Sequence, residues 1–152
     1  MMKIRTDYVT NSSSSSFILG FNSQDEIYDI IASSLPDYWS RSAIKDVIND
    51  VIDGVSSKDE IIRAYRDGLH VYREPFKGKD WWQLSLEEME SEEYKQFIEG
   101  VEDDWTRSFE EELSEYDVVS IVEYEDHSDF GSTMEHEIMP NLSCTICRIS
   151  HH

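Results

Sequence analysis

The pattern of apolar and polar positions along the chain predicts strands near both ends and helices between them. Residues 2–8 alternate between uncharged and charged side chains, which is typical of a half-buried strand. Residues 17–19 form a continuous apolar run that predicts a second strand, buried on both faces. Residues 118–122 and 144–150 are rich in β-branched and apolar side chains, which predicts a central strand and a closing strand.

Four apolar stripes with a helical period lie between these strands. They predict helices over residues 23–35, 40–54, 57–68 and 85–116. Ser57 and Ser85 each precede a glutamate at the spacing of a capping box, so we expect each to begin a helix. Gly68 is expected to end the third helix in a left-handed conformation, and Gly100 to break or bend the fourth.

Grouping of the helices between the strands favours an α+β fold over repeated βαβ units. We therefore expect a small, mostly antiparallel sheet built from the N- and C-terminal segments, with about four helices packed against it. The chain has 152 residues and no convincing linker or break in composition. This length predicts a single domain over residues 1–152.

The charge is strongly negative and unevenly placed. Lysine and arginine number 13 against 33 aspartates and glutamates, for a net charge of −20. Fourteen acidic residues lie between Leu86 and Asp117, where only Lys95 and Arg107 oppose them. A negative field repels phosphates, so we expect no direct binding to nucleic acid or to an anionic membrane. No apolar run has the roughly 18 residues of a membrane span and no signal peptide is recognisable, which predicts a cytoplasmic protein.

The acidic segment suggests the first functional hypothesis, a non-catalytic interaction protein. In this interpretation the helix over residues 86–117 binds a basic protein partner. The plainer alternative is a solvated helix face that keeps the protein in solution. Trp81 and Trp82 are adjacent, so both cannot point inward from an extended segment, and we expect one of them at a pocket or an interface. The oligomeric state stays open.

Clustering of histidines near the C-terminus suggests the second hypothesis, a metal-binding protein or a hydrolase. Four of the five histidines lie in the last 26 residues, among several carboxylates. Histidine and carboxylate are ligands of zinc and other divalent metals, and they also serve as general acids and bases. The candidate residues are His127, His136, His151 and Glu135. Ordinary surface histidines are the alternative. If the strand that ends at His151 paired directly with the strand that precedes His127, a parallel pairing would bring the two histidines together, and an antiparallel pairing would separate them.

Cys144 and Cys147 are three residues apart in the predicted closing strand. Because side chains alternate between the faces of a strand, the two thiols are expected to point to opposite faces. This geometry favours two structural thiols over zinc ligation or redox chemistry.

The serine run predicts a polar loop between the first two strands. Its members, Ser12, Ser13, Ser14, Ser15 and Ser16, carry hydroxyl and N–H groups that would bind phosphate or another anion. A nucleophilic serine, a modified serine, a processing point and a merely flexible loop are the alternatives.

The segment Lys3-Ile4-Arg5-Thr6-Asp7-Tyr8-Val9-Thr10-Asn11, followed by the serines and Phe17, resembles the opening segment of assorted bacterial proteins, many of them uncharacterised. The resemblance spans Lys3 to Phe17, about a tenth of the chain. It implies no activity and supplies no site residues. It does suggest that the serine run has a role of its own.

Overall fold

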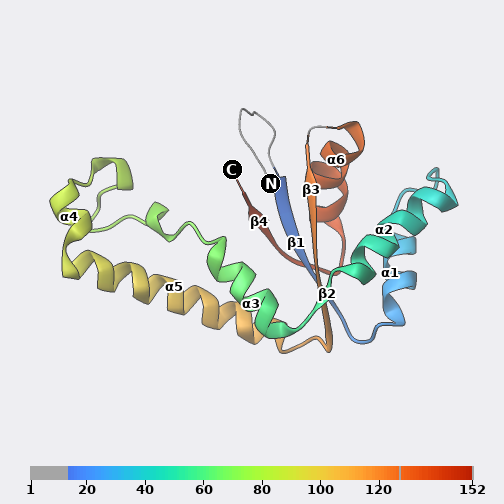
Figure 1. Cartoon of the computed structure of the whole chain (residues 1–152), viewed down its shortest axis with the longest axis horizontal. Coiled ribbons are helices and arrows are strands. Elements are labelled where there is room, and N and C mark those ends of the chain that lie inside the picture. Colours follow the sequence, from blue (N-terminus) through green and yellow to red (C-terminus); the bar gives the residue numbers. More distant parts are fainter. Residues whose placement is uncertain (1–13, 127, 152) are drawn as a thin grey trace.

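A computed structural model of the chain describes residues 14–126 and 128–151. Within them, four strands form one antiparallel sheet in the order β2-β3-β1-β4 (Figure 1). The α+β prediction is confirmed, while the strand expected over residues 2–8 lies outside the described part of the chain. The strands are β1 (Ser14–Phe21), β2 (Val55–Ser56), β3 (Val118–Glu125) and β4 (Thr145–Ser150).

Strand β1 is the buried centre of the sheet. Phe17, Ile18 and Leu19 have no exposed surface, as the apolar run predicted. The strand begins earlier than expected, however, because Ser14, Ser15 and Ser16 pair with residues 125–123 of β3. The predicted loop is therefore wrong for these three serines, since backbone pairing with a neighbouring strand outweighs their turn preference. Ser12 and Ser13 lie outside the described residues.

Two helices begin at the predicted capping boxes, but the first begins at Glu26 rather than after Ser23, and the fourth is divided. Ser57 and Ser85 each accept a hydrogen bond from the backbone of a glutamate whose side chain bonds back to the serine N–H. The fourth predicted helix is two helices, and the break falls at Ser91 rather than at Gly100. Ser91 has an extended backbone, and its hydroxyl caps the next helix at Tyr94. The helices are α1 (Glu26–Ser34), α2 (Arg41–Asp53), α3 (Lys58–Asp67), α4 (Leu86–Glu90), α5 (Glu92–Leu113) and α6 (Asp129–Thr133).

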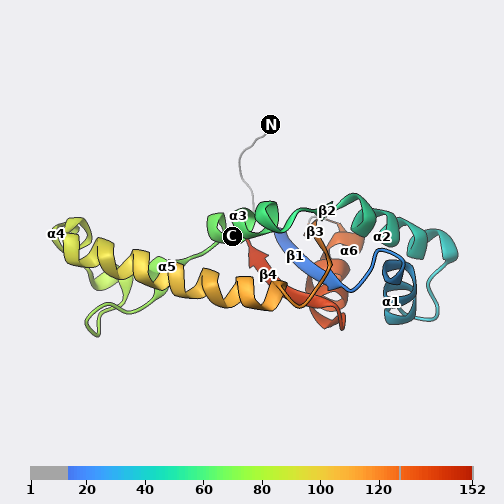
Figure 2. The same cartoon turned by 90° about the horizontal axis from the view of Figure 1, so that it is seen from below.

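The sheet has a hydrophobic cluster on each face. Phe17 and Leu19 project into the cluster that α1 and α2 cover, whereas Ile18 projects into the one beneath α3 and α5. Helix α5 extends well beyond the sheet (Figures 1 and 2) and, with α4 and the loops before it, forms an arm. A third, smaller cluster of Phe76, Leu84 and Tyr94 stabilises the arm. No described helix has both the length and the apolar character needed to cross a membrane.

The glycines that follow α2 and α3 leave no room for a side chain, and neither has a left-handed backbone. Gly54 and Gly68 have φ values of −85° and −94°, so the left-handed conformation expected at Gly68 is wrong. A Cβ atom on Gly54 would collide with the carbonyl oxygen of Ile121, and one on Gly68 with the side chain of Ile149. Gly54 also accepts a backbone hydrogen bond from Ile121 at 3.0 Å, so helix α2 ends in direct contact with β3. Gly100, by contrast, faces open space.

Alanine substitution at two glycines should therefore change stability in opposite directions. Gly54→Ala should lower the free energy of unfolding by about 1–3 kcal/mol or more, because the methyl group overpacks against β3. Gly100→Ala, in the interior of α5, should raise it by about 0.5–1 kcal/mol. Urea unfolding followed by circular dichroism measures both. An unchanged midpoint for Gly54→Ala would contradict the close approach of α2 to β3.

Candidate metal centre

Sheet topology brings the C-terminal ends of β3 and β4 to one end of the sheet. Strands β3 and β4 both run antiparallel to β1, so they run parallel to each other with β1 between them. Their C-terminal ends therefore lie together, beside the first residues of β1. Asp126 follows β3 and His151 follows β4 at this end. Neither of the two direct pairings that the sequence left open is formed, because β1 lies between β3 and β4; the two strands nevertheless run in the same direction.

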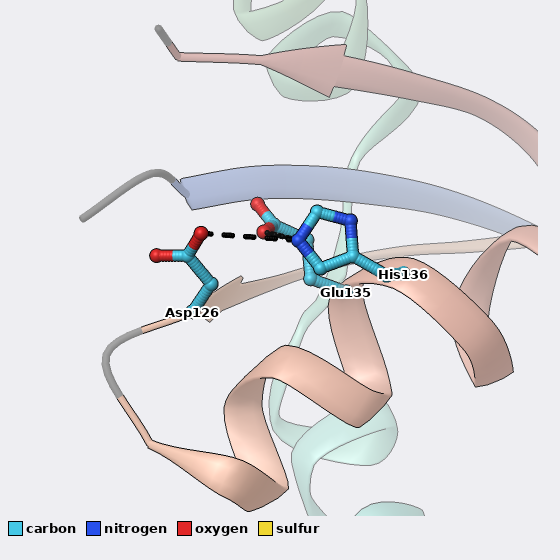
Figure 3. Close-up of side chains that lie close together, drawn as sticks. All are labelled: Asp126, Glu135 and His136. Carbon is cyan, nitrogen blue, oxygen red and sulfur yellow. Dashed lines mark ion pairs between the residues drawn. The ribbon is translucent and has the colours of Figure 1, made fainter. Parts of the chain in front are cut away.

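Asp126, Glu135 and His136 form a group of potential metal ligands at this end of the sheet (Figure 3). One ligand atom from each residue lies within 4.8 Å of the other two. His136 Nε2 is 3.0 Å from Glu135 Oε1 and 3.8 Å from Asp126 Oδ2. The Glu135 side chain is fully buried, whereas the His136 side chain is 47% exposed. The group therefore joins a buried carboxylate to the solvent through an imidazole.

Local structure after β3 places Glu135 and His136. Ser128 caps α6 by accepting a hydrogen bond from the Gly131 N–H at 3.0 Å, and the chain continues into the π-helical turn η3 (Met134–Ile138). π-Helical turns are rare and frequently occur at functional sites. The turn buries Met134 and Glu135 against the sheet and leaves His136 at the surface. The short helix η4 (Met139–Asn141) then leads towards β4.

Arg148 and Ser15 complete the surroundings of the buried carboxylate. Arg148 Nη2 lies 3.9 Å from Glu135 Oε2, and its Nε donates a hydrogen bond of 2.9 Å to Ser15 Oγ. The guanidinium also lies 5.7 Å from the centre of the Phe17 ring. A charged group buried in a protein needs compensating charge nearby, and Arg148 supplies part of it. Sequence reasoning missed Arg148, whose only signal is a charged residue within an otherwise uncharged strand.

His151 does not join this group, because the sheet lies between them. Ser16 pairs with Ile149, which belongs to the cluster under α3 and α5, so Ser16 projects from that face. Its hydroxyl is 2.8 Å from His151 Nε2. Ser16 is only 6% exposed, which keeps a substrate away from this hydroxyl and argues against its use as a nucleophile. His127 lies outside the described residues.

The two cysteines are also separated by the sheet, as their spacing predicted. Cys144 packs in the cluster under α1 and α2, and Cys147 packs against the cluster on the other face. Burial raises the pKa of the Cys144 thiol to about 11. Burial and the charge of Glu112 raise the pKa of Cys147 to about 12. Both thiols are therefore protonated at neutral pH, whereas zinc ligation and thiol–disulfide exchange require the thiolate.

The donor set of the group is one imidazole nitrogen and two carboxylate oxygens. Ligand atoms around one ion lie roughly 3–4 Å apart for bonds near 2.1 Å, so small side-chain adjustments would let all three reach it. Comparisons with protein-family models, curated proteins and solved structures find no match to this chain. The assignment of the group therefore depends on its own geometry.

The raised thiol pKa values predict slow alkylation of the folded protein. At pH 8 iodoacetamide should modify both cysteines at least about 100-fold more slowly than an unperturbed thiol with a pKa near 8.5, because so little thiolate is present. The rate should rise about tenfold per pH unit up to pH 10. Mass spectrometry measures the rates, with the urea-unfolded chain as the control. Rapid modification of the folded protein at pH 8 would contradict the buried, protonated state.

Proposed function

We propose that this protein binds a divalent metal ion through Asp126, Glu135 and His136. The observation that carries the proposal is the fully buried Glu135 carboxylate, 3.0 Å from an imidazole nitrogen and close to a second carboxylate. Burying a carboxylate costs several kcal/mol unless positive charge compensates for it. Because Arg148 and His136 already lie beside Glu135, the proposal rests on the convergence of the three ligand atoms rather than on missing charge.

The ligand types indicate which ions to test. Imidazole with carboxylates suits zinc, manganese and ferrous iron, whereas magnesium prefers oxygen ligands alone. A set of three protein ligands leaves coordination positions for water, as in catalytic rather than structural zinc sites. A bound ion would then act as a Lewis acid, which is the chemistry of the hydrolase alternative. Arg148, held by Ser15, would keep the Glu135 carboxylate oriented towards the ion.

Zinc or manganese should bind the purified protein with a stoichiometry of one and raise its melting temperature. Glu135→Gln and His136→Asn should each weaken binding by at least about tenfold, because each removes a ligand. Binding should also weaken as the pH falls, since protons compete with the metal for the ligands. Isothermal titration calorimetry measures the affinity at each pH.

Two matched variants control for loss of charge and for loss of a histidine. Glu137→Gln removes an exposed carboxylate from the same helical turn, and His151→Asn removes a histidine from the opposite face of the sheet. Both should bind metal as the unmodified protein does. Absence of binding, or equal weakening in all four variants, would refute the proposed site and leave Glu135 with a structural ion pair only.

Binding of a basic partner by the acidic arm is the second candidate function. Fourteen acidic residues lie between Leu86 and Asp117. Five of them form ion pairs with described basic residues. The other nine form no such pair within the described part of the chain, and most of them are exposed. This unneutralised charge on α4, α5 and the turn after α5 favours a cationic partner and disfavours nucleic acid.

Charge removal on the arm should weaken binding of a cationic probe. A fluorescein-labelled oligoarginine peptide should bind the protein, and rising salt should weaken the binding through screening. The triple variant Glu99→Gln, Glu110→Gln, Glu111→Gln should bind it several-fold more weakly, as measured by fluorescence anisotropy. The control variant Asp25→Asn, Asp29→Asn, Asp37→Asn removes equal charge near α1, at the other end of the molecule. Equal weakening in both variants would indicate non-specific attraction rather than binding by the arm.

A further inference from the structure

Three exposed aromatic side chains form a row along the loops of the arm. The ring centres of Tyr72 and Trp81 are 5.5 Å apart, and those of Trp81 and Trp82 are 5.9 Å apart, with edge-to-face angles of 85° and 84°. The residues Tyr72, Trp81 and Trp82 are 39%, 43% and 67% exposed. We call these three residues the aromatic row. Adjacent large aromatic residues at a protein surface frequently mark an interaction site.

Packing and a hydrogen bond hold the backbone at Trp81 and Trp82. Trp81 and Trp82 lie in the short helix η2 (Trp81–Gln83), and the next residue, Leu84, is buried in the cluster with Phe76 and Tyr94. The side chain of Gln83 accepts a hydrogen bond of 2.8 Å from the Asp80 N–H. The two indole rings therefore project from an ordered backbone. Little backbone entropy is lost when a partner binds to them.

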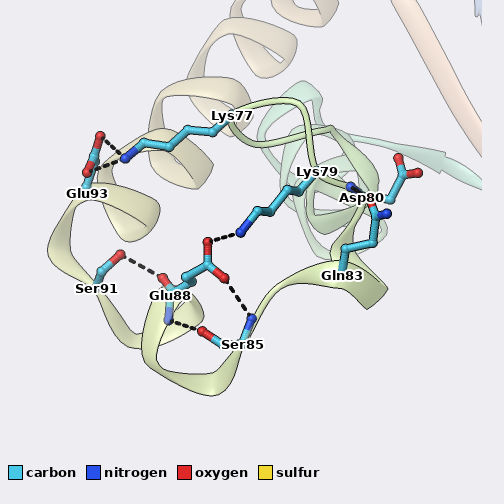
Figure 4. A network of polar contacts seen from close by, with 8 residues as sticks. All are labelled: Lys77, Lys79, Asp80, Gln83, Ser85, Glu88, Ser91 and Glu93. Atoms are coloured by element: carbon cyan, nitrogen blue, oxygen red, sulfur yellow. Dashed lines mark hydrogen bonds and ion pairs between the residues drawn. The ribbon is translucent and has the colours of Figure 1, made fainter.

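The charges around the aromatic row are mainly negative. Seven acidic residues and three basic ones lie between Arg73 and Glu93. Lys77 and Lys79 pair with Glu93 and Glu88 at 3.0 Å each (Figure 4). The third basic residue, Arg73, has its guanidinium carbon 5.7 Å from the centre of the Tyr72 ring. Among the described residues, no cationic group lies over the ring of Trp81 or Trp82.

We propose that the aromatic row binds the arginine or lysine side chains of a basic peptide segment in a partner protein. The face of an indole ring is electronegative and attracts a cation, and tryptophan is the strongest of the aromatic residues in this respect. Trp82, the most exposed of the three, is the principal contact. The proposal depends on binding of a basic partner by the acidic arm, and it names the surface that receives the cationic side chains. The surrounding acidic residues attract the segment, while the aromatic row provides short-range recognition.

The test compares variants of Trp82 for binding of the labelled oligoarginine peptide. Trp82→Ala should weaken binding by about 2- to 30-fold, the range expected for one cation–π contact. Trp82→Phe should retain part of the affinity, because a smaller aromatic face remains. The control is Tyr38→Ala, since Tyr38 is 86% exposed and lies near α1, at the other end of the molecule. Circular dichroism melting should show that all three variants are folded.

The outcomes separate this proposal from binding by the arm itself. Loss of affinity in Trp82→Ala but not in Tyr38→Ala supports the aromatic row. If Trp82→Ala binds normally while the triple glutamate variant does not, the acidic arm binds the peptide and the aromatic row is not its recognition surface. If the unmodified protein does not bind the peptide, both proposals fail. Equal weakening in Trp82→Ala and Tyr38→Ala would also overturn the role of the aromatic row.

Discussion

Pairing of β1 with an antiparallel strand on each side is the constraint on which the rest of the structure depends. Because β3 and β4 both oppose β1, their C-terminal ends meet beside Ser14, Ser15 and Ser16. Side chains of β1 alternate between two hydrophobic clusters, so Ser15 projects towards Arg148 and Ser16 towards His151. A shift of this strand by one residue would exchange all of these neighbours, and burial on both faces opposes such a shift.

Burial divides the acidic residues of this protein into two physically different kinds. Glu135 is enclosed between the sheet and a π-helical turn, and its carboxylate lies 3.0 Å from the half-exposed imidazole of His136. The glutamates of the arm are mostly exposed, and a surface ion pair such as Lys77 with Glu93 contributes little stability. Their effect is collective, a negative field that reaches about one Debye length, roughly 8 Å in physiological salt. Most of the net charge of −20 therefore comes from the region after Leu86, and its value says little about the candidate metal centre.

Local signals predicted most of the helices and the buried strand. Ser57 and Ser85 begin helices because a capping box depends only on residues three apart, and residues 17–19 are buried because they are apolar. One failure comes from competition with a partner distant in sequence. Ser14, Ser15 and Ser16 favour turns locally, yet pairing with β3 makes them a strand. A second failure is local: the break falls at Ser91, whose hydroxyl caps α5, while Gly100 lies within the continuous helix.

The sequence by itself determined the α+β class, the helix starts at Ser57 and Ser85, the opposite orientation of the two cysteines and the acidic character of the region after Leu86. These properties depend on composition and on spacings of two to four residues. Only the tertiary structure decided that Glu135 and His136 meet Asp126 while His151 lies on the other face of the sheet. Only the tertiary structure, likewise, showed that Arg148 lies beside Glu135 and that Tyr72 continues the row of Trp81 and Trp82. Strand order and the path of the connecting loops set these neighbours, and neither is encoded in a local pattern.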